Sequence, residues 1–352
     1  MWLARENLTL PRLPVGASRA VVVGVPARDE ASHIIPFLAA LDHSAGLVRA
    51  PVTIIVGANN CADDTAALAR AFAARWARIE VEEIALPAER AHAGGARRHV
   101  MDRAAEVAEA GGVVMTTDAD SRIDVDWIAA NLGEIAGGAD AVAGVITFDP
   151  AARVGLPDLD HRADEWRLAE LHARLEDLID PRAHDPWPRR IWAWGASLAL
   201  TVDTYRAVGG VPLVALAEDR ALADAVERAG FRLRRSHAPL VFTSPRLSGR
   251  APGGFADLLA SHAEVSLPCD AALEPTRALL RRLVLRARLR VETGSRFPAL
   301  WATIEATTPR LGRRRLLPAD LAREVQQAER LIAALQRRAE RRDDSPAVAL
   351  AA

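Results

Sequence analysis

Residues 113–127 read VVMTTDADSRIDVDW, and the interpretation of the whole chain depends on this stretch. The uncharged run over residues 113–117 is rich in β-branched side chains and predicts a buried strand. Two carboxylates, Asp118 and Asp120, follow the run at once. Two acids at the end of a buried strand repel each other and lose hydration, so we expect a cation or a ligand beside them.

Strand-like and helix-like segments alternate around this stretch. The expected strands are residues 20–25, 52–56, 79–84 and 113–117. The expected helices are residues 33–41, residues 65–76 and a third helix that reaches about residue 109. Buried strands separated by helices of this length indicate an α/β protein with a largely parallel sheet covered on both faces. Ligands of such sheets bind beyond the carboxyl ends of the strands, where the polar loops of this chain converge, so one shared pocket is predicted.

The rest of the chain becomes progressively more helical. A long amphipathic helix is expected over residues 159–178, and a helix over residues 218–230 leads into another strand. Beyond residue 255 the pattern is helical to the end. One apolar helix face there is formed by Leu321, Val325, Ala328, Leu331 and Leu335.

Composition excludes several classes of protein. The 352 residues are half hydrophobic and about a quarter charged, with a formal net charge of −1, which is typical of a globular protein. Lysine is absent throughout, so a phosphate loop of the Walker type, a Schiff-base enzyme and a kinase of the usual kind are not expected. The two cysteines, Cys61 and Cys269, suggest neither a disulfide framework nor a Cys-based metal site.

No segment resembles a membrane anchor. The longest uncharged apolar stretch, residues 191–202, falls short of the roughly 20 residues that a membrane span needs. The N-terminal residues lack the apolar core of a signal peptide, so a cytoplasmic location is expected. The C-terminal part is basic, because 17 Arg stand against 9 Asp and Glu from Ala271 onward. A solvated helical face and a surface for anionic lipid or a phosphorylated acceptor are both open interpretations.

Asp-x-Asp occurs three times, and only the first copy follows a buried strand. The copies at Asp124/Asp126 and Asp158/Asp160 stand where helices are expected to begin, so helix capping explains them. Carboxylates such as Asp118 and Asp120 suit a hard divalent ion, Mg²⁺ or Mn²⁺, whose remaining ligands are phosphate oxygens and water. Such an ion neutralises charge on a departing diphosphate, so a metal and a nucleotide diphosphate are predicted here.

Five segments in order resemble the motifs of glycosyltransferase family 2. They are VVVGVPARDEA, IIVGANNCADDTAALA, AGGARRHVMDRA, VVMTTDAD, and WGASLALTVDTYRAVGGVP with the following AEDRALADAVERAGFRLRR. Together they span about 240 residues, 20–259. The resemblance implies a GT-A fold and metal-dependent, inverting transfer of a single sugar from a nucleotide-diphospho-sugar to a hydroxyl acceptor.

The resemblance also implies a domain organisation. Residues 1–19 would lead into a GT-A domain over residues 20–260. Its nucleotide-sugar half would be residues 20–125 and its acceptor half residues 126–260. Residues 261–352 would form a basic helical extension.

By position, the family pattern also implies site residues. The implied nucleotide-sugar contacts are Pro26, Arg28, Glu30, Asn59, Asn60, Asp63, Arg97 and Asp118. The metal would be held by Asp118 and Asp120, and Asp219 would be the general base with Glu218 beside it. Inversion is a single in-line displacement, so one carboxylate near the acceptor hydroxyl suffices as the base. Helix capping is the competing explanation for Asp219.

Two further segments suggest ligand contacts from residue type alone. SPRLSGRAPGGF places Arg246 and Arg250 on a Gly-rich loop, where each guanidinium offers a bidentate clamp for a diphosphate. PWPRRIWAW contains Trp187, Trp192 and Trp194, whose rings are platforms for sugars or members of a packed core.

Departures from the family pattern keep other functions open. Ala58 stands where the family usually has Asp, and Thr243 stands where a His often lies near the metal, with His237 nearby but out of register. The Gln-x-x-Arg-Trp signature of processive members is absent. A catalytically inert nucleotide-sugar binding protein and a retaining GT-A transferase are therefore alternatives. A nucleotidyltransferase or a Rossmann dehydrogenase would need a Gly-rich loop after the first strand, where this chain reads VPARDEA.

Overall fold

A computed structural model describes residues 19–149, 163–246, 257 and 267–343. The chain divides into two compact units. The first unit comprises Met1–Gly155 and Ala193–Ala256, and the second comprises Leu156–Trp192 and Asp257–Ala352. This division differs from the expected domain boundaries, because the segment from Leu156 to Trp192 groups with the C-terminal helices.

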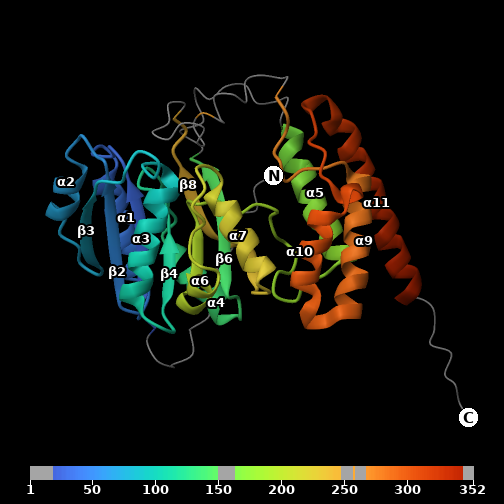
Figure 1. The fold of residues 1–352 in the computed structure, drawn as a ribbon, viewed down its shortest axis with the longest axis horizontal. Helices are drawn as coiled ribbons and strands as arrows, with labels where there is room; N and C mark the ends of the chain where they lie inside the picture. The colour runs from blue at the N-terminus through green and yellow to red at the C-terminus, as the bar shows by residue number, and fades with distance from the viewer. Residues whose placement is uncertain (1–18, 150–162, 247–256, 258–266, 344–352) are drawn as a thin grey trace, which may run out of the picture. The chain divides into compact units, whose positions relative to one another are not determined.

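The first unit is built on an eight-stranded mixed sheet (Figure 1). Its strands are β1 (Val21–Ala27), β2 (Val52–Asn59), β3 (Arg78–Ile84), β4 (Val113–Thr116), β5 (Arg122–Ile123), β6 (Ala141–Phe148), β7 (Leu198–Thr201) and β8 (Leu233–Thr243). The strand order is β3-β2-β1-β4-β7-β6-β8-β5. Strands β1, β2, β3 and β4 pair in parallel, and so do β6 and β8. Strand β7 is antiparallel to both β4 and β6, and strand β5 is antiparallel to β8. The predicted α/β class with a mixed, mainly parallel sheet is confirmed.

Two helical layers cover the sheet, and side chains alternate between them along each strand. Val21 and Val23 of β1 pack with α1 (Ile34–Ala45), α2 (Thr65–Ala71) and α4 (Trp127–Ala136). Val22, which points to the other face, packs with α3 (Ala93–Ala108), α6 (Val202–Ala207) and α7 (Glu218–Arg228). The period-2 alternation of a strand explains why one uninterrupted valine run supplies both cores.

Helix α3 packs closely against the sheet where two strand positions are glycine. A Cβ added at Gly24 would lie 2.9 Å from the Val100 carbonyl oxygen, and one at Gly57 would lie 2.4 Å from Val100 Cγ1. The absence of these side chains lets the backbone of α3 approach β1 and β2. The first turns of the helix, including Arg97, are thereby held next to the carboxyl ends of the strands.

The second unit is helical over its described residues. It contains α5 (Ala163–Ile179), α9 (Thr276–Thr293), α10 (Phe297–Thr307) and α11 (Leu321–Asp343), with short 3₁₀ turns at Gly294–Arg296, Pro309–Leu311 and Pro318–Asp320. Helix α5 packs against α11 and α9, which is why it belongs with the C-terminal helices. Leu321, Val325 and Ala328 of the expected apolar face are buried. Among the described residues, no helix combines the length and the apolar character that crossing a membrane requires.

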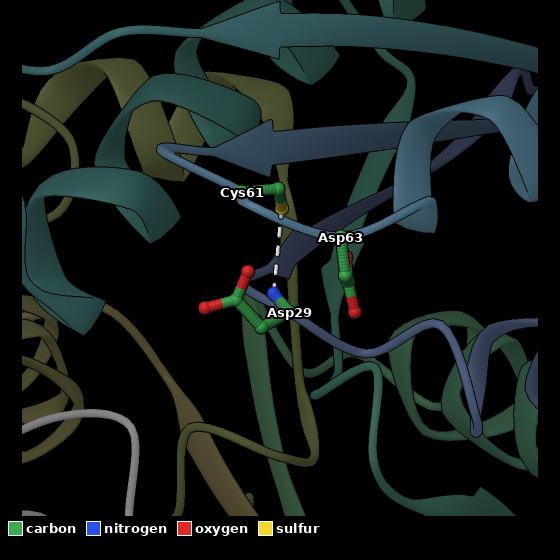
Figure 2. A group of neighbouring side chains, drawn as sticks. All are labelled: Asp29, Cys61 and Asp63. Atoms are coloured by element: carbon green, nitrogen blue, oxygen red, sulfur yellow. Dashed lines mark hydrogen bonds between the residues drawn. The ribbon is translucent and has the colours of Figure 1, made fainter.

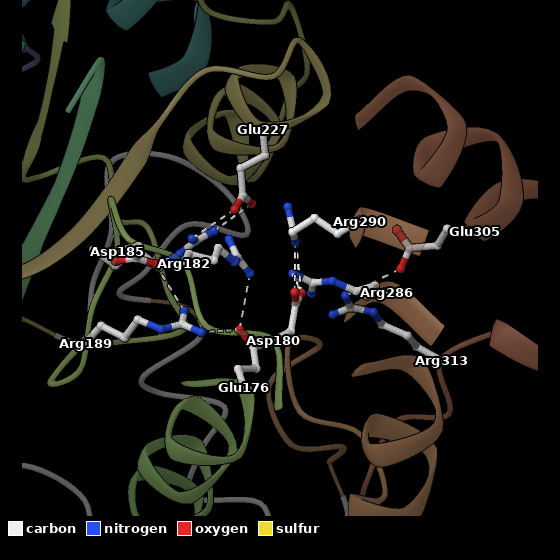
Figure 3. A network of polar contacts seen from close by, with 11 residues as sticks. Glu176, Asp180, Arg182, Asp185, Arg189, Glu227, Arg286, Arg290, Glu305 and Arg313 are labelled. Atoms are coloured by element: carbon white, nitrogen blue, oxygen red, sulfur yellow. Dashed lines mark hydrogen bonds and ion pairs between the residues drawn. The ribbon is translucent and has the colours of Figure 1, made fainter. Parts of the chain in front are cut away.

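Ion pairs with low solvent exposure run through the second unit. Glu176 of α5 accepts hydrogen bonds from Arg182 (3.3 Å) and Arg189 (2.6 Å) (Figure 3). Burial opposes the charge of Glu176, but Arg189 and Arg182 outweigh it and hold the pKa of this carboxyl well below its usual range. Asp180 likewise pairs with Arg290 at 2.8 Å and Arg286 at 3.1 Å.

One helix ends earlier than expected. The helix predicted over residues 65–76 stops at Ala71, because the following segment is held by α1 instead. The Asp42 carboxylate accepts hydrogen bonds from the backbone N–H groups of Arg75, Trp76 and Ala77 at 2.8–3.0 Å. Those N–H groups are therefore not available to continue the helix.

Candidate active site

The predicted carboxylates lie at the carboxyl edge of the sheet in the first unit. Asp118 and Asp120 follow β4, and Glu30 follows β1. The turn after β4 is closed by a hydrogen bond from the Ser121 N–H to the Asp118 carbonyl, 3.1 Å. Parallel pairing of β1 with β4 brings these loops together, as the sequence predicts.

A single buried arginine joins the two halves of the predicted site. Arg97 donates from Nη2 to Asp118 Oδ1 (2.8 Å) and from Nε to Glu218 Oε1 (3.0 Å). Its Nη1 donates to Thr116 Oγ1 (3.1 Å) and to the Gly195 carbonyl (2.8 Å). Burial alone would lower the pKa of Arg97, but the charges of Asp118 and Glu218 raise it, so the guanidinium stays cationic. Because these contacts occupy Arg97, the geometry favours a positioning role, and direct contact with a nucleotide stays a prediction.

Gly195 links Arg97 to the predicted base, Asp219. Its N–H donates to Asp219 Oδ2 at 2.7 Å, while its carbonyl accepts from Arg97. A Cβ at this position would lie 2.6 Å from Arg97 Nη2, so only glycine lets the guanidinium lie against this backbone. Gly195 belongs to the WGASLAL segment of the fifth motif, but its contacts with Arg97 and Asp219 are not predictable from the sequence, because both partners lie far away along the chain.

The acidic pair Glu218-Asp219 begins helix α7. Ala217 before it has a left-handed backbone, φ 58°, which ends the preceding loop abruptly. Glu218 is buried and bound to Arg97, while Asp219 is partly exposed. Burial, followed by the charge of Glu218, raises the pKa of Asp219, against the opposing effects of Arg97 and of the Gly195 and Arg220 N–H groups. A carboxylate of raised pKa is a stronger base than an ordinary Asp while it remains ionised.

A second arginine bridges the other acids of the site. Arg246 Nη2 lies 2.8 Å from both Glu30 Oε1 and Asp120 Oδ2. Burial and the neighbouring Asp118 raise the pKa of Asp120 to about 6, even though Arg246 opposes this change. Arg246 thus reaches the predicted metal ligand, whereas Arg250 lies outside the described residues.

The remaining predicted nucleotide contacts brace the loops around the edge. Arg28 Nη1 donates to the Ala91 carbonyl (3.1 Å), and Asn60 exchanges two hydrogen bonds with the Leu86 backbone (3.1 and 3.2 Å).

Asp63 accepts a hydrogen bond from the Ala31 N–H at 3.0 Å, and this bond joins the loops after β1 and β2. Pro26 lies inside β1, level with Gly57 of β2.

An unpredicted side-chain cluster links the same two loops. Asp29, Cys61 and Asp63 place one ligand atom each within 4.8 Å of one another (Figure 2). Internal bonds already engage this cluster, since Cys61 Sγ accepts from the Asp29 N–H (3.4 Å) and Asp29 Oδ1 accepts from the Ala62 N–H (2.7 Å). The cluster therefore fastens the loop after β1 to the loop after β2.

The aromatic candidates make packing contacts within their own units. Trp192 is buried in the second unit and packs edge-on against Trp166, with ring centroids 4.8 Å apart. Trp187 lies under Arg174 of the same unit, and Trp194 packs against a core of the first unit. These contacts favour packing over sugar binding.

His237 lies within β8, and Thr243 ends that strand.

Comparisons with known proteins find structural but not sequence relatives. No family model and no curated protein matches the chain. Of the solved structures, TarS of S. aureus bound to UDP is 12% identical over 82% of this chain and 72% of its own, with a TM-score of 0.46. The mannosyltransferase PcManGT of Pyrobaculum calidifontis with GDP-Man and Mn²⁺ is 18% identical over 87% and 86%, with a TM-score of 0.45. Glucosyl-3-phosphoglycerate synthase of Mycobacterium tuberculosis with Mn²⁺, UDP and phosphoglyceric acid is 19% identical over 75% and 88%, also with a TM-score of 0.45. At these values neither a ligand nor a residue's role transfers to this chain, so the chemistry of its site rests on its own side chains.

Proposed function

We propose that this protein is a GT-A glycosyltransferase that transfers a single sugar, with inversion, from a nucleotide-diphospho-sugar to a hydroxyl acceptor. The observation that carries the proposal is the placement of Arg97. It binds Asp118 of the Asp-x-Asp pair and Glu218 beside the candidate base, two motifs about a hundred residues apart. A transferase needs donor-binding and base-supplying groups held at a fixed separation, and one buried guanidinium supports that arrangement.

The carboxylates fit a divalent cation, Mg²⁺ or Mn²⁺. Asp118 uses only Oδ1 for Arg97, and its side chain is 35% exposed, so the other oxygen is open to a ligand. Asp120 supplies a second hard oxygen donor. A cation held there would neutralise charge developing on the departing diphosphate. Two buried oxygens at the same edge, Asn59 Oδ1 and Thr117 Oγ1, have no hydrogen-bond partner within the described part of the chain, which suits a polar ligand.

Asp219 is the residue proposed to deprotonate the acceptor hydroxyl. The N–H groups of Gly195 and Arg220 fix both of its oxygens, each at 2.7 Å. These bonds hold the carboxylate in one orientation, and its raised pKa increases its basicity. Glu218 is bound to Arg97 and is a positioning residue.

Binding and turnover test the proposal separately. The melting temperature is measured with UDP-, GDP- and dTDP-sugars, with and without Mn²⁺, because a ligand that binds only the folded state raises it. We expect a metal-dependent rise for one nucleotide class that Asp120→Asn removes. Absence of a rise with any of these donors, together with absence of sugar release, would contradict the transferase assignment.

The two alternatives predict different results in the same assays. A catalytically inert nucleotide-sugar binding protein would show the metal-dependent rise in melting temperature but neither hydrolysis nor transfer. A retaining transferase would form a product whose anomeric configuration matches the donor. The NMR coupling of the product's anomeric proton distinguishes retention from inversion.

Contact of the basic helices with anionic lipid is part of the proposal. Arg330, Arg337 and Arg338 are exposed on α11. Charges so placed attract anionic lipid by roughly 1 kcal/mol each near a membrane surface. We expect the full chain to sediment with phosphatidylglycerol vesicles in low salt and not with phosphatidylcholine vesicles. Replacement of the three arginines by Glu should abolish this; equal binding to both vesicles would contradict the hypothesis.

A further inference from the structure

Arg246 occupies the space between two acids of the candidate metal site. Its Nη2 lies 2.8 Å from Glu30 Oε1 and 2.8 Å from Asp120 Oδ2, and its Nη1 lies 3.2 Å from Glu30 Oε2. The side chains of Glu30 and Asp120 are only 5% and 14% exposed. Poorly hydrated carboxylates need a cation, and Arg246 supplies it in this structure.

We propose that Arg246 is the resident counter-ion of Glu30 and Asp120, that a divalent cation displaces it from Asp120, and that the released guanidinium then binds the diphosphate of the donor. This inference rests on the proposed function, because it assumes that the site takes both a metal and a nucleotide diphosphate. It gives Arg246 two positions, one for the empty site and one for the loaded site.

Arg246, unlike Arg97, is placed to move. Arg97 contacts four partners, among them a backbone carbonyl, and its side chain is 5% exposed. The side chain of Arg246 is 27% exposed, and within the described part of the chain its side-chain contacts are with the two carboxylates. An ion pair at a partly exposed site is exchangeable, because water and other ions can replace either member.

Charge balance explains why metal and diphosphate would act together. A divalent cation on Asp120 repels Arg246 and competes for the same carboxylate oxygen. A diphosphate offers the displaced guanidinium a new bidentate partner. Each ligand therefore favours the arrangement that the other requires, and by linkage each should strengthen the binding of the other.

Metal titration without nucleotide tests the displacement step. Mn²⁺ binding is measured by electron paramagnetic resonance of the free ion for wild type and Arg246→Gln. We expect Arg246→Gln to bind Mn²⁺ about tenfold more tightly, because the competing charge is gone, a change equal to about 1.4 kcal/mol. Arg246→Lys, which keeps the charge, should resemble wild type. Asp120→Asn should lose the site.

Arg122→Gln is the matched control. Arg122 lies two residues from Asp120 but pairs with Asp149 and lies over the ring of Phe242, so its removal takes the same charge from the neighbourhood without touching the two acids. We expect its Mn²⁺ affinity to stay within about twofold of wild type. Equal strengthening in both variants would overturn the specific role of Arg246 and indicate a general charge effect.

A second titration tests the coupling. The nucleoside diphosphate selected by the melting-temperature screen should tighten Mn²⁺ binding in wild type and do so several-fold less in Arg246→Gln. If wild type binds Mn²⁺ and transfers sugar, but Arg246→Gln binds Mn²⁺ alone no more tightly, this inference fails and the proposed function stands. If wild type binds no Mn²⁺ with or without nucleotide and transfers no sugar, both fail together. Melting temperatures of all variants without ligand establish that each is folded.

Discussion

At the scale of single residues, the proposed site depends on groups that hold other site residues in place. Arg97 holds Asp118 and Glu218, and Gly195 provides a carbonyl for Arg97 and an N–H for Asp219. The proposed base, Asp219, and the proposed metal ligand, Asp118, therefore share one support, which consists of Arg97 and Gly195. Small changes at that support should alter catalysis more than they alter binding of the donor.

Gly195→Ala tests the support directly. The new Cβ would lie 2.6 Å from Arg97 Nη2, so the guanidinium must move from its present contacts. We expect the free energy of unfolding to fall by about 1–3 kcal/mol and transfer to fall at least tenfold. Urea unfolding and initial rates measure the two effects.

Gly133→Ala serves as the control for that experiment. Gly133 lies in α4, and a Cβ there would meet nothing within 4 Å. A helical glycine replaced by alanine should gain about 0.5–1 kcal/mol of stability. If Gly195→Ala retained both wild-type stability and wild-type rates, the packing of Arg97 against Gly195 would have no functional importance.

Asp219 should set the acid limb of the pH–rate profile. Burial, and then Glu218, raises its pKa from the ordinary 3.8, so the carboxylate protonates at a higher pH than a surface Asp does. Because the ionised form is the base, we expect kcat/KM to fall with decreasing pH, with a midpoint above 3.8. Asp219→Asn should lower kcat by about 10²–10⁴-fold while donor-induced changes in melting temperature persist. Full activity of that variant would remove Asp219 from the mechanism.

At the scale of elements, one helix determines where another ends. The Asp42 carboxylate on α1 binds three backbone N–H groups of residues 75–77 and so ends α2 at Ala71. A helix pattern that continues to Trp76 in the sequence is overridden by this tertiary contact. Local propensity is a weak guide where a buried carboxylate competes for the same N–H groups.

Asp42→Ala should therefore destabilise the first unit. Three N–H groups would lose a charged acceptor, and we expect a loss of about 3 kcal/mol in the free energy of unfolding. Asp64→Ala is the matched substitution, since exposed Asp64 precedes α2 without a capping hydrogen bond from its side chain. That control should change stability by less than about 0.5 kcal/mol. Equal effects in urea unfolding would contradict the role given to Asp42.

At the scale of the whole molecule, much of the basic character of the second unit is neutralised internally. Arg282 is buried between Glu274 and Glu305, and Arg286 and Arg290 share Asp180. The arginine-rich composition thus has a structural use that the sequence count alone did not reveal. Exposed arginines on α11 remain as candidates for contact with anionic lipid.

His172 should make the stability of the molecule depend on pH. It is buried in α5 with Nε2 3.3 Å from Thr276 Oγ1, and burial lowers its pKa from 6.5 to about 4 despite the nearby Glu176 and Glu324. Between these values the unfolded chain binds a proton that the folded chain does not, so stability falls as the pH falls from 6.5 toward 4. We expect His172 to make the protein about 2 kcal/mol less stable at pH 5 than at pH 7.

His172→Gln isolates this contribution from other groups. Glu176 and Asp180 have lowered pKa values in the folded protein. Their stabilising effect is therefore lost only when the pH falls below about 4, where these groups begin to protonate in the unfolded chain. Asp120, whose pKa is raised to about 6, changes stability in the opposite sense over the same range, so His172 is read from the difference between wild type and His172→Gln in urea unfolding at pH 5 and pH 7. A pH dependence of the same size in wild type and His172→Gln would contradict this assignment.

The sequence by itself determined the α/β class, the positions of the first four strands along the chain and the edge at which the acids gather. These follow from local patterns, because side-chain periodicity within a strand and the chemistry at its end are written in neighbouring residues. Only the tertiary structure decided which charges meet. Arg97 binds Glu218 from 121 positions away, and Arg246 binds Glu30 from 216 positions away. It also decided that α5 packs with the C-terminal helices. Such pairings depend on how the sheet and its helices fold together in space, and no local pattern in the chain specifies them.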